Sequence, residues 1–151
     1  MDKILLTTDL SQESKEAISI AAELARKFGA SVEILTVLED PAQAAMAYAL
    51  EFPVFPDVEI QKQVVEKIRK ELDKIVSEEF EGIAASAHVV EAKGPVHAEI
   101  RDYAKNNSVD LIVIASHGHS GIKSLLMGSV AERVAKSADC PVLIVPVKSR
   151  E

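Results

Sequence analysis

Short apolar runs alternate along the chain with stretches in which apolar residues recur at helical spacing. The runs cover residues 4–7, 32–38, 87–90, 111–115 and 141–146, and the helical stretches begin near residues 12, 58, 95 and 130. Consecutive parallel strands need such a helix between them. The alternation therefore predicts an α/β fold, a three-layer, Rossmann-like arrangement with an open five-stranded parallel sheet between helices. We expect one domain over residues 1–151, because this length suits a single core.

Two helices can be predicted in more detail. The helix over residues 12–28 has Ser11 available as its N-cap and Gly29 as its stop. The helix that begins at Val58 ends at Gly82. The predicted apolar face of the first comprises Ala17, Ile20, Ala21, Leu24 and Phe28, and that of the second comprises Ile60, Val64, Ile68, Leu72 and Ile75. The run 87–90 is short and flanked by polar residues, so we expect it at an edge of the sheet.

Residues 39–57 interrupt the alternation. They contain three prolines, an alanine-rich patch and three aromatic residues. A connection this long in a compact domain is a lid, an interface element or a mobile segment, and these alternatives stay open.

Composition excludes several classes of protein. The net charge of −7 argues against an extended nucleic-acid surface, which needs clustered lysine and arginine. The first residues lack the apolar core of a signal peptide, and no run of about eighteen apolar residues occurs, so we expect a cytoplasmic protein without membrane insertion. Cys140 is the only cysteine, which excludes an internal disulfide and a cysteine-based zinc site; it is predicted to be a buried, unreactive thiol.

Two loops carry the residues suited to binding a ligand. Thr7, Thr8 and Asp9 follow the first predicted strand, and the glycine-containing stretch 115–129 follows the fourth and leads into a helix. Ligands of open parallel sheets bind beyond the carboxyl ends of the strands, where the strand order reverses. If the first and fourth strands are neighbours, both loops line one cleft. The glycine loop and the helix N-terminus suit a phosphate, and the acidic residue suits ribose hydroxyls or a metal.

Familiar motifs do not account for this loop. Residues 121–124 echo the end of a Walker A motif, but Ile122 stands where that motif needs glycine before Lys123. The dinucleotide fingerprint and the nucleophile elbow are also absent from the sequence. His117 and His119 form an isolated HxH pair without a nearby cysteine or carboxylate cluster, so no metal site is predicted.

The same residues resemble a known family. Thr8-Asp9 after the first strand, Val37 at the end of the second, and Ala115-x-x-Gly118 followed after nine residues by Gly128-Ser129 are similar to the universal stress protein family, from end to end of the chain. The ATP-binding branch of that family has G-x-x-G, nine residues and G-[S/T]. Ala115 departs from the first position of this pattern.

The resemblance implies strand order 3-2-1-4-5 and an ATP-binding, homodimeric stress-response regulator, with AMP or ADP as further ligands. By the resemblance, Asp9 serves the adenosine side with Thr7 and Thr8 near it, and the Val37 backbone meets the adenine edge. Ala115 lies against the ribose and α-phosphate, with His117 in the same loop. The phosphates take contacts from Gly118, Gly128, Ser129 and Val130, and Mg²⁺ can bridge them. Two copies pair through the last strand, Val142–Val145.

Simpler interpretations and rival functions stay open at this point. Asp9 can be a turn residue that bonds local N–H groups. Ser129 and Glu132 spell a capping box, which would occupy donors at the helix start, and Lys123 can be an ordinary solvated charge. The rival functions are a slow ATPase that uses His117 or His119 as a base, and a nucleotide-free interaction dimer in which Ala115 marks a lost site. The partner, the stress signal and any hydrolysis of ATP cannot be predicted.

Overall fold

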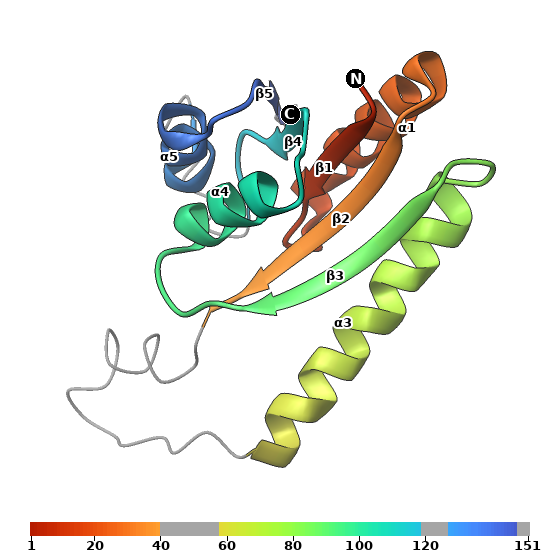
Figure 1. Cartoon of the computed structure of the whole chain (residues 1–151). Helices are drawn as coiled ribbons and strands as arrows, with labels where there is room; N and C mark the ends of the chain where they lie inside the picture. Colours follow the sequence, from red (N-terminus) through yellow and green to blue (C-terminus); the bar gives the residue numbers. More distant parts are fainter. Residues whose placement is uncertain (40–57, 119–126, 148–151) are drawn as a thin grey trace.

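The sheet has five parallel strands in the order β3-β2-β1-β4-β5 (Figure 1). This computed structural model describes residues 1–39, 58–118 and 127–147. The strands are β1 (Lys3–Thr7), β2 (Ser31–Leu38), β3 (Ala85–Glu91), β4 (Leu111–Ala115) and β5 (Val142–Val145). The α/β fold and the strand order are therefore confirmed, as is the edge position of the third strand.

Helices cover both faces of this sheet. The helical elements are the short 3-10 helix η1 (Gln12–Ser14), α1 (Lys15–Phe28), α3 (Val58–Glu79), α4 (Val96–Asn106) and α5 (Ser129–Ser137). Figure 1 shows α1 and α3 on one side of the sheet and α4 and α5 on the other. Side chains of β1 alternate between the two resulting cores, since Ile4 and Leu6 pack with α1 and α3 whereas Leu5 packs with α4 and α5.

Helix α1 buries a different face from the one predicted. Ala17 and Ala21 are buried as expected, and Ile20 and Leu24 pack at the margin of the core, but Ile18 and Ala25 complete the buried stripe and Phe28 is 53% exposed. Phe28 is the last residue of α1, where Gly29 with φ 65° ends the helix as predicted. The side chain of Ser11 makes no capping hydrogen bond, so its prediction as the N-cap was wrong in that respect.

Only the second half of α3 contributes to the core. Leu72 is fully buried, and Ile68 and Ile75 are partly buried and pack against the same core. Ile60 and Val64, in contrast, are 59% and 46% exposed. The reason is the extent of the sheet, because the first turns of α3 lie beyond the carboxyl end of β3 (Figure 1). Within residues 1–39, 58–118 and 127–147, no helix has both the length and the apolar character needed to cross a membrane.

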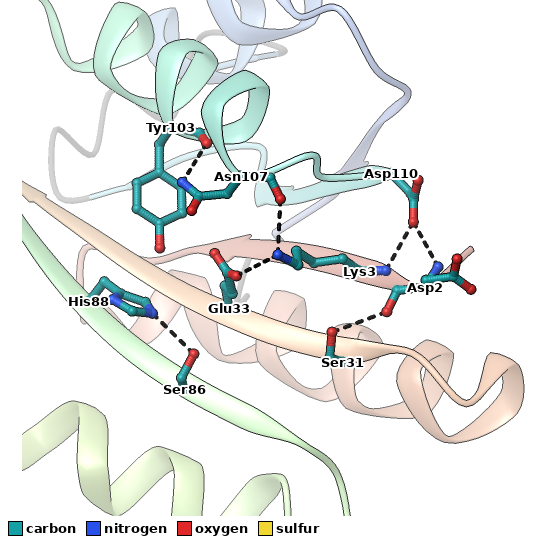
Figure 2. Close-up of polar contacts among 9 residues, drawn as sticks. All are labelled: Asp2, Lys3, Ser31, Glu33, Ser86, His88, Tyr103, Asn107 and Asp110. Carbon is teal, nitrogen blue, oxygen red and sulfur yellow. Dashed lines mark hydrogen bonds and ion pairs between the residues drawn. The ribbon is translucent and has the colours of Figure 1, made fainter.

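Polar contacts fasten the start of β1 to the loop before β4 (Figure 2). The Asp110 carboxylate accepts hydrogen bonds from the backbone N–H groups of Asp2 and Lys3, at 2.7 and 3.0 Å, and these bonds hold its pKa below the ordinary value. The Lys3 ammonium donates to the Asn107 carbonyl at 2.9 Å and lies 3.0 Å from a Glu33 oxygen. In the pairing of these two strands Ile4 lies opposite Leu111 and Leu6 opposite Val113, so β1 and β4 end at nearly the same level.

Candidate functional site

A cavity of about 510 Å³ lies at the carboxyl end of the sheet. Because β1 pairs with β4, the loops after these two strands meet there, as the switch-point argument predicted. All ten residues predicted for the site line this one cavity: Thr7, Thr8, Asp9, Val37, Ala115, His117, Gly118, Gly128, Ser129 and Val130.

The loop after β1 holds Asp9 in a fixed turn. The Ser11 N–H donates to one carboxylate oxygen of Asp9 at 3.0 Å, and the Leu10 N–H donates to the Thr8 hydroxyl at 3.0 Å. Leu10 has a left-handed backbone, with φ 62°, which a leucine adopts only where its surroundings impose it. The turn interpretation of Asp9 is thus correct for one oxygen, and the side chain still reaches the cavity.

Buried hydroxyl groups support this turn from below. The Thr8 hydroxyl donates to that of Ser14 at 2.9 Å, and Ser14 donates to the Ser11 carbonyl at 2.7 Å. From β2, the Thr36 hydroxyl donates to the Thr8 carbonyl at 2.9 Å. Sequence reasoning missed Ser14 and Thr36, because their roles are hydrogen bonds to residues 6 and 28 positions away along the chain. Together these bonds fix the position of the Asp9 turn relative to the end of β1.

The end of β4 contributes Ala115 and the residues after it. Ala115 is 9% exposed and has a strand backbone, with φ outside the left-handed region, so glycine is not required there by conformation. It lines the cavity and also belongs to the core formed with α1 and α3. The Ser116 hydroxyl accepts a hydrogen bond from the Val147 N–H at 3.0 Å and lies 3.0 Å from His117 Nδ1. His119, Gly121 and Lys123 lie outside the described residues.

Gly128 brings the start of α5 against the end of β4. Its N–H donates to the Ser116 carbonyl at 2.6 Å, and a Cβ at this position would lie 2.8 Å from the same oxygen. The requirement for glycine is therefore steric. Gly128 is also the N-cap of α5, so Ser129 is the first helical residue and caps nothing.

The predicted capping box does not form. The Glu132 carboxylate pairs with Lys136 Nζ at 2.5 Å instead of reaching back to the helix start. The first N–H groups of a helix have no acceptors within the helix. No side chain of the described residues caps the start of α5, and its first residues line the cavity.

The cavity combines a polar rim with apolar walls. Val37, Leu38, Ile68, Val96 and Ile100 supply apolar surface from β2, α3 and α4, and Gly118, Gly128 and the first residues of α5 complete the lining. Such a site suits a flat apolar ring joined to an anionic group. In the described part of the chain, no three histidine, cysteine or acidic side chains come together as a metal cluster.

Comparison with known proteins finds relatives that match nearly the whole length of the chain. The model of the universal stress protein family matches residues 1–146. The universal stress protein MJ0531 of Methanocaldococcus jannaschii is 32% identical over 149 residues, which cover 99% of this chain and 84% of that protein. The universal stress protein YxiE of Bacillus subtilis is 32% identical over 147 residues, covering 95% and 98%.

Solved structures share the fold. The protein MJ0577 superposes with a TM-score of 0.81 at 27% identity, covering 99% of this chain and 98% of its own. Two more distant structures contain nucleotides. One is a universal stress protein in complex with cAMP, with a TM-score of 0.69, 22% identity and coverage of 97% and 98%. The other is the Archaeoglobus fulgidus universal stress protein in complex with dAMP, with a TM-score of 0.65, 23% identity and coverage of 98% of each chain.

Proposed function

Because the chain belongs to the universal stress protein family, we propose that it is a regulatory protein that binds an adenine nucleotide, ATP or its products ADP and AMP. The observation that carries this proposal is the cavity at the carboxyl end of the sheet, where the loops after β1 and β4 meet the start of α5. Helix N-termini and glycine-rich turns favour phosphates because their N–H groups point at the ligand. The complexes of other family members with cAMP and dAMP support the same ligand class.

Each part of the cavity has a role in this proposal. The Val37 backbone meets the adenine edge, and Asp9, near Thr7 and Thr8, serves the adenosine side. Ala115 lies against the ribose and the first phosphate, with His117 beside it. The phosphates are held by Gly118, Gly128, Ser129 and Val130, whose positions around the rim support this assignment.

We propose further that the protein is a homodimer joined through β5. This strand is at the edge of the sheet, so one of its sides has no neighbouring strand among the described residues. Leu143 on β5 is 37% exposed. An apolar edge strand is a pairing surface unless something covers it, and a second copy would cover it.

A slow ATPase is the second candidate. His117 lines the cavity, and the 3.0 Å contact between its Nδ1 and the Ser116 hydroxyl gives the ring a defined position. Turnover of bound ATP that is lost in His117→Ala, with binding retained, would favour this candidate.

Native mass spectrometry of the purified protein tests the main proposal, since it reports stoichiometry and any nucleotide carried through purification. Calorimetry with adenine nucleotides then tests the site through Ala115→Val, whose added methyl groups would narrow the cavity. The matched control is Ala85→Val, at the start of β3 and the opposite end of the sheet. We expect Ala115→Val to weaken binding about tenfold and Ala85→Val to leave it unchanged, in line with ~1–2 kcal/mol for a small steric clash. Failure of the wild type to bind any adenine nucleotide at millimolar concentration would favour the nucleotide-free dimer.

A further inference from the structure

Ser116 follows directly after β4, and its hydroxyl group joins two parts of the chain that meet at the cavity. The hydroxyl oxygen accepts a hydrogen bond from the Val147 N–H at 3.0 Å and lies 3.0 Å from His117 Nδ1. The backbone of Ser116 is held as well, because its N–H donates to the Val145 carbonyl at 2.8 Å and its carbonyl accepts from the Gly128 N–H at 2.6 Å. Ser116 lines the cavity but is only 5% exposed, so it supports the cavity wall from within.

The contact with Val147 indicates the direction of the hydrogen bond between Ser116 and His117. A backbone N–H can only donate, so the Ser116 oxygen is the acceptor in that contact and the hydroxyl hydrogen must find another partner. Among the residues that the structure describes, His117 Nδ1 is the acceptor within hydrogen-bond distance of this hydroxyl. If the ring donated from Nδ1 instead, the hydroxyl hydrogen would be buried without an acceptor among these residues, which is unfavourable. The hydroxyl therefore donates to Nδ1.

This direction fixes the tautomer of His117. A neutral imidazole carries one hydrogen, so a ring whose Nδ1 accepts a hydrogen bond carries that hydrogen on Nε2. We propose that Ser116 is a positioning residue that holds His117 as the Nε2–H tautomer, so that the ring acts toward a bound nucleotide as a hydrogen-bond donor and not as a base. A general base needs an available lone pair, and in this tautomer the lone pair of the ring is engaged by Ser116. This inference rests on the proposed function and argues against the ATPase candidate.

Nitrogen-15 NMR of the imidazole rings, in the whole chain without nucleotide, tests the tautomer. Spectra at alkaline pH, where the ring signals no longer change with pH, distinguish a nitrogen that carries hydrogen from one that does not. The signals of His117 among the four histidines are assigned by their loss in His117→Asn. We expect the wild type to carry hydrogen on Nε2, with an Nδ1 signal displaced by the hydrogen bond from Ser116. In Ser116→Ala this displacement should be lost.

Calorimetry with AMP tests whether the position of the ring contributes to binding. We expect Ser116→Ala to weaken AMP binding about fivefold, which corresponds to the net contribution of one hydrogen bond. Ser77→Ala is the matched control, because Ser77 is exposed on α3 and its hydroxyl donates to the Lys74 carbonyl at 2.9 Å. This control should change neither the affinity for AMP nor the imidazole signals of His117.

Three results would overturn the inference. A wild-type ring with its hydrogen on Nδ1 contradicts it directly, and this measurement stays decisive if Ser116→Ala folds poorly. An Nδ1 signal that is the same in wild type and Ser116→Ala contradicts it too. The third result is turnover of ATP that is lost in His117→Ala while binding is retained, since the ring would then act as a base. In all three cases nucleotide binding survives, whereas absence of binding by both AMP and ATP refutes the proposed function and with it the donor role of His117.

Discussion

Removal of the Ser14 hydroxyl group tests most directly which hydrogen bonds hold the loop after β1 in place. It accepts a hydrogen bond from Thr8 and donates one to the Ser11 carbonyl, at 2.9 and 2.7 Å, and the residue is 2% exposed. A buried hydrogen bond between neutral groups contributes about 1 kcal/mol net, so Ser14→Ala should lower the free energy of unfolding by about 2 kcal/mol.

Urea unfolding near neutral pH is the assay, with the slope of the transition compared between variants to confirm that the unfolded states match. Ser19→Ala, in the helix α1 that follows Ser14, is the control, because the Ser19 hydroxyl is exposed and lies 3.4 Å from the Lys15 carbonyl. We expect that variant to change stability by less than about 0.5 kcal/mol. A cycle that combines Ser14→Ala with Thr8→Val should show a coupling of about 1 kcal/mol.

The reasoning is refuted if Ser14→Ala costs no more than Ser19→Ala. It is also refuted if the effects of Ser14→Ala and Thr8→Val simply add, since two residues that share a buried hydrogen bond must show coupling. A third result would also refute it: Ser14→Ala loses the full 2 kcal/mol expected for about two hydrogen bonds, and yet its affinity for nucleotide is unchanged. The loop would then hold Asp9 without help from Ser14.

Three further predictions follow from burial, charge and the exposed edge. Leu72→Ala should lower the free energy of unfolding by about 2–5 kcal/mol in urea, whereas Val64→Ala on the same helix should cost less than about 0.5 kcal/mol, because Leu72 is fully buried and Val64 is 46% exposed. The folded-state pKa of Asp110 is lowered from 3.8, so its charge stabilises the fold above that value and the contribution is lost as the pH falls through the folded-state pKa. Urea midpoints of wild type and Asp110→Asn should therefore differ near pH 7 and converge in acid, once the pH lies below the folded-state pKa; equal differences at neutral and acid pH would contradict this. Leu143→Lys should convert the proposed dimer to a monomer in native mass spectra without lowering the thermal midpoint by more than ~3 °C, and an unchanged dimer would show that β5 is not the interface.

Local sequence patterns predicted the helices and strands of this fold, but not which part of each helix packs on the sheet. β1 and β4 were recognisable because central strands of a parallel sheet are covered on both faces and so are almost wholly apolar. The stripe of α3 was misjudged because periodicity shows which residues share a face, and not where the sheet beneath that face ends. Ile60 satisfies the pattern as well as Leu72 does, yet only Leu72 has a strand to pack against.

The candidate site was predictable where it depends on residues that follow strands. Asp9 and Gly118 come directly after neighbouring strands, so topology alone brings them together. Thr36 was not predictable, because its role is a hydrogen bond to a residue 28 positions away. The capping box over Ser129 failed because the close approach of Gly128 to the Ser116 carbonyl makes Gly128 the N-cap and moves Ser129 into the helix.

The central position of β1 has a consequence for how the chain folds as it is synthesised. One neighbour, β2, follows within about 40 residues, but Ile4 faces Leu111 on the other side. At roughly 5–20 residues per second, several seconds separate the emergence of β2 from that of β4. During this interval the first strand of the nascent chain has an unpaired apolar edge, the kind of surface that chaperones bind. Native pairing on both sides of β1 therefore depends on the last third of the chain.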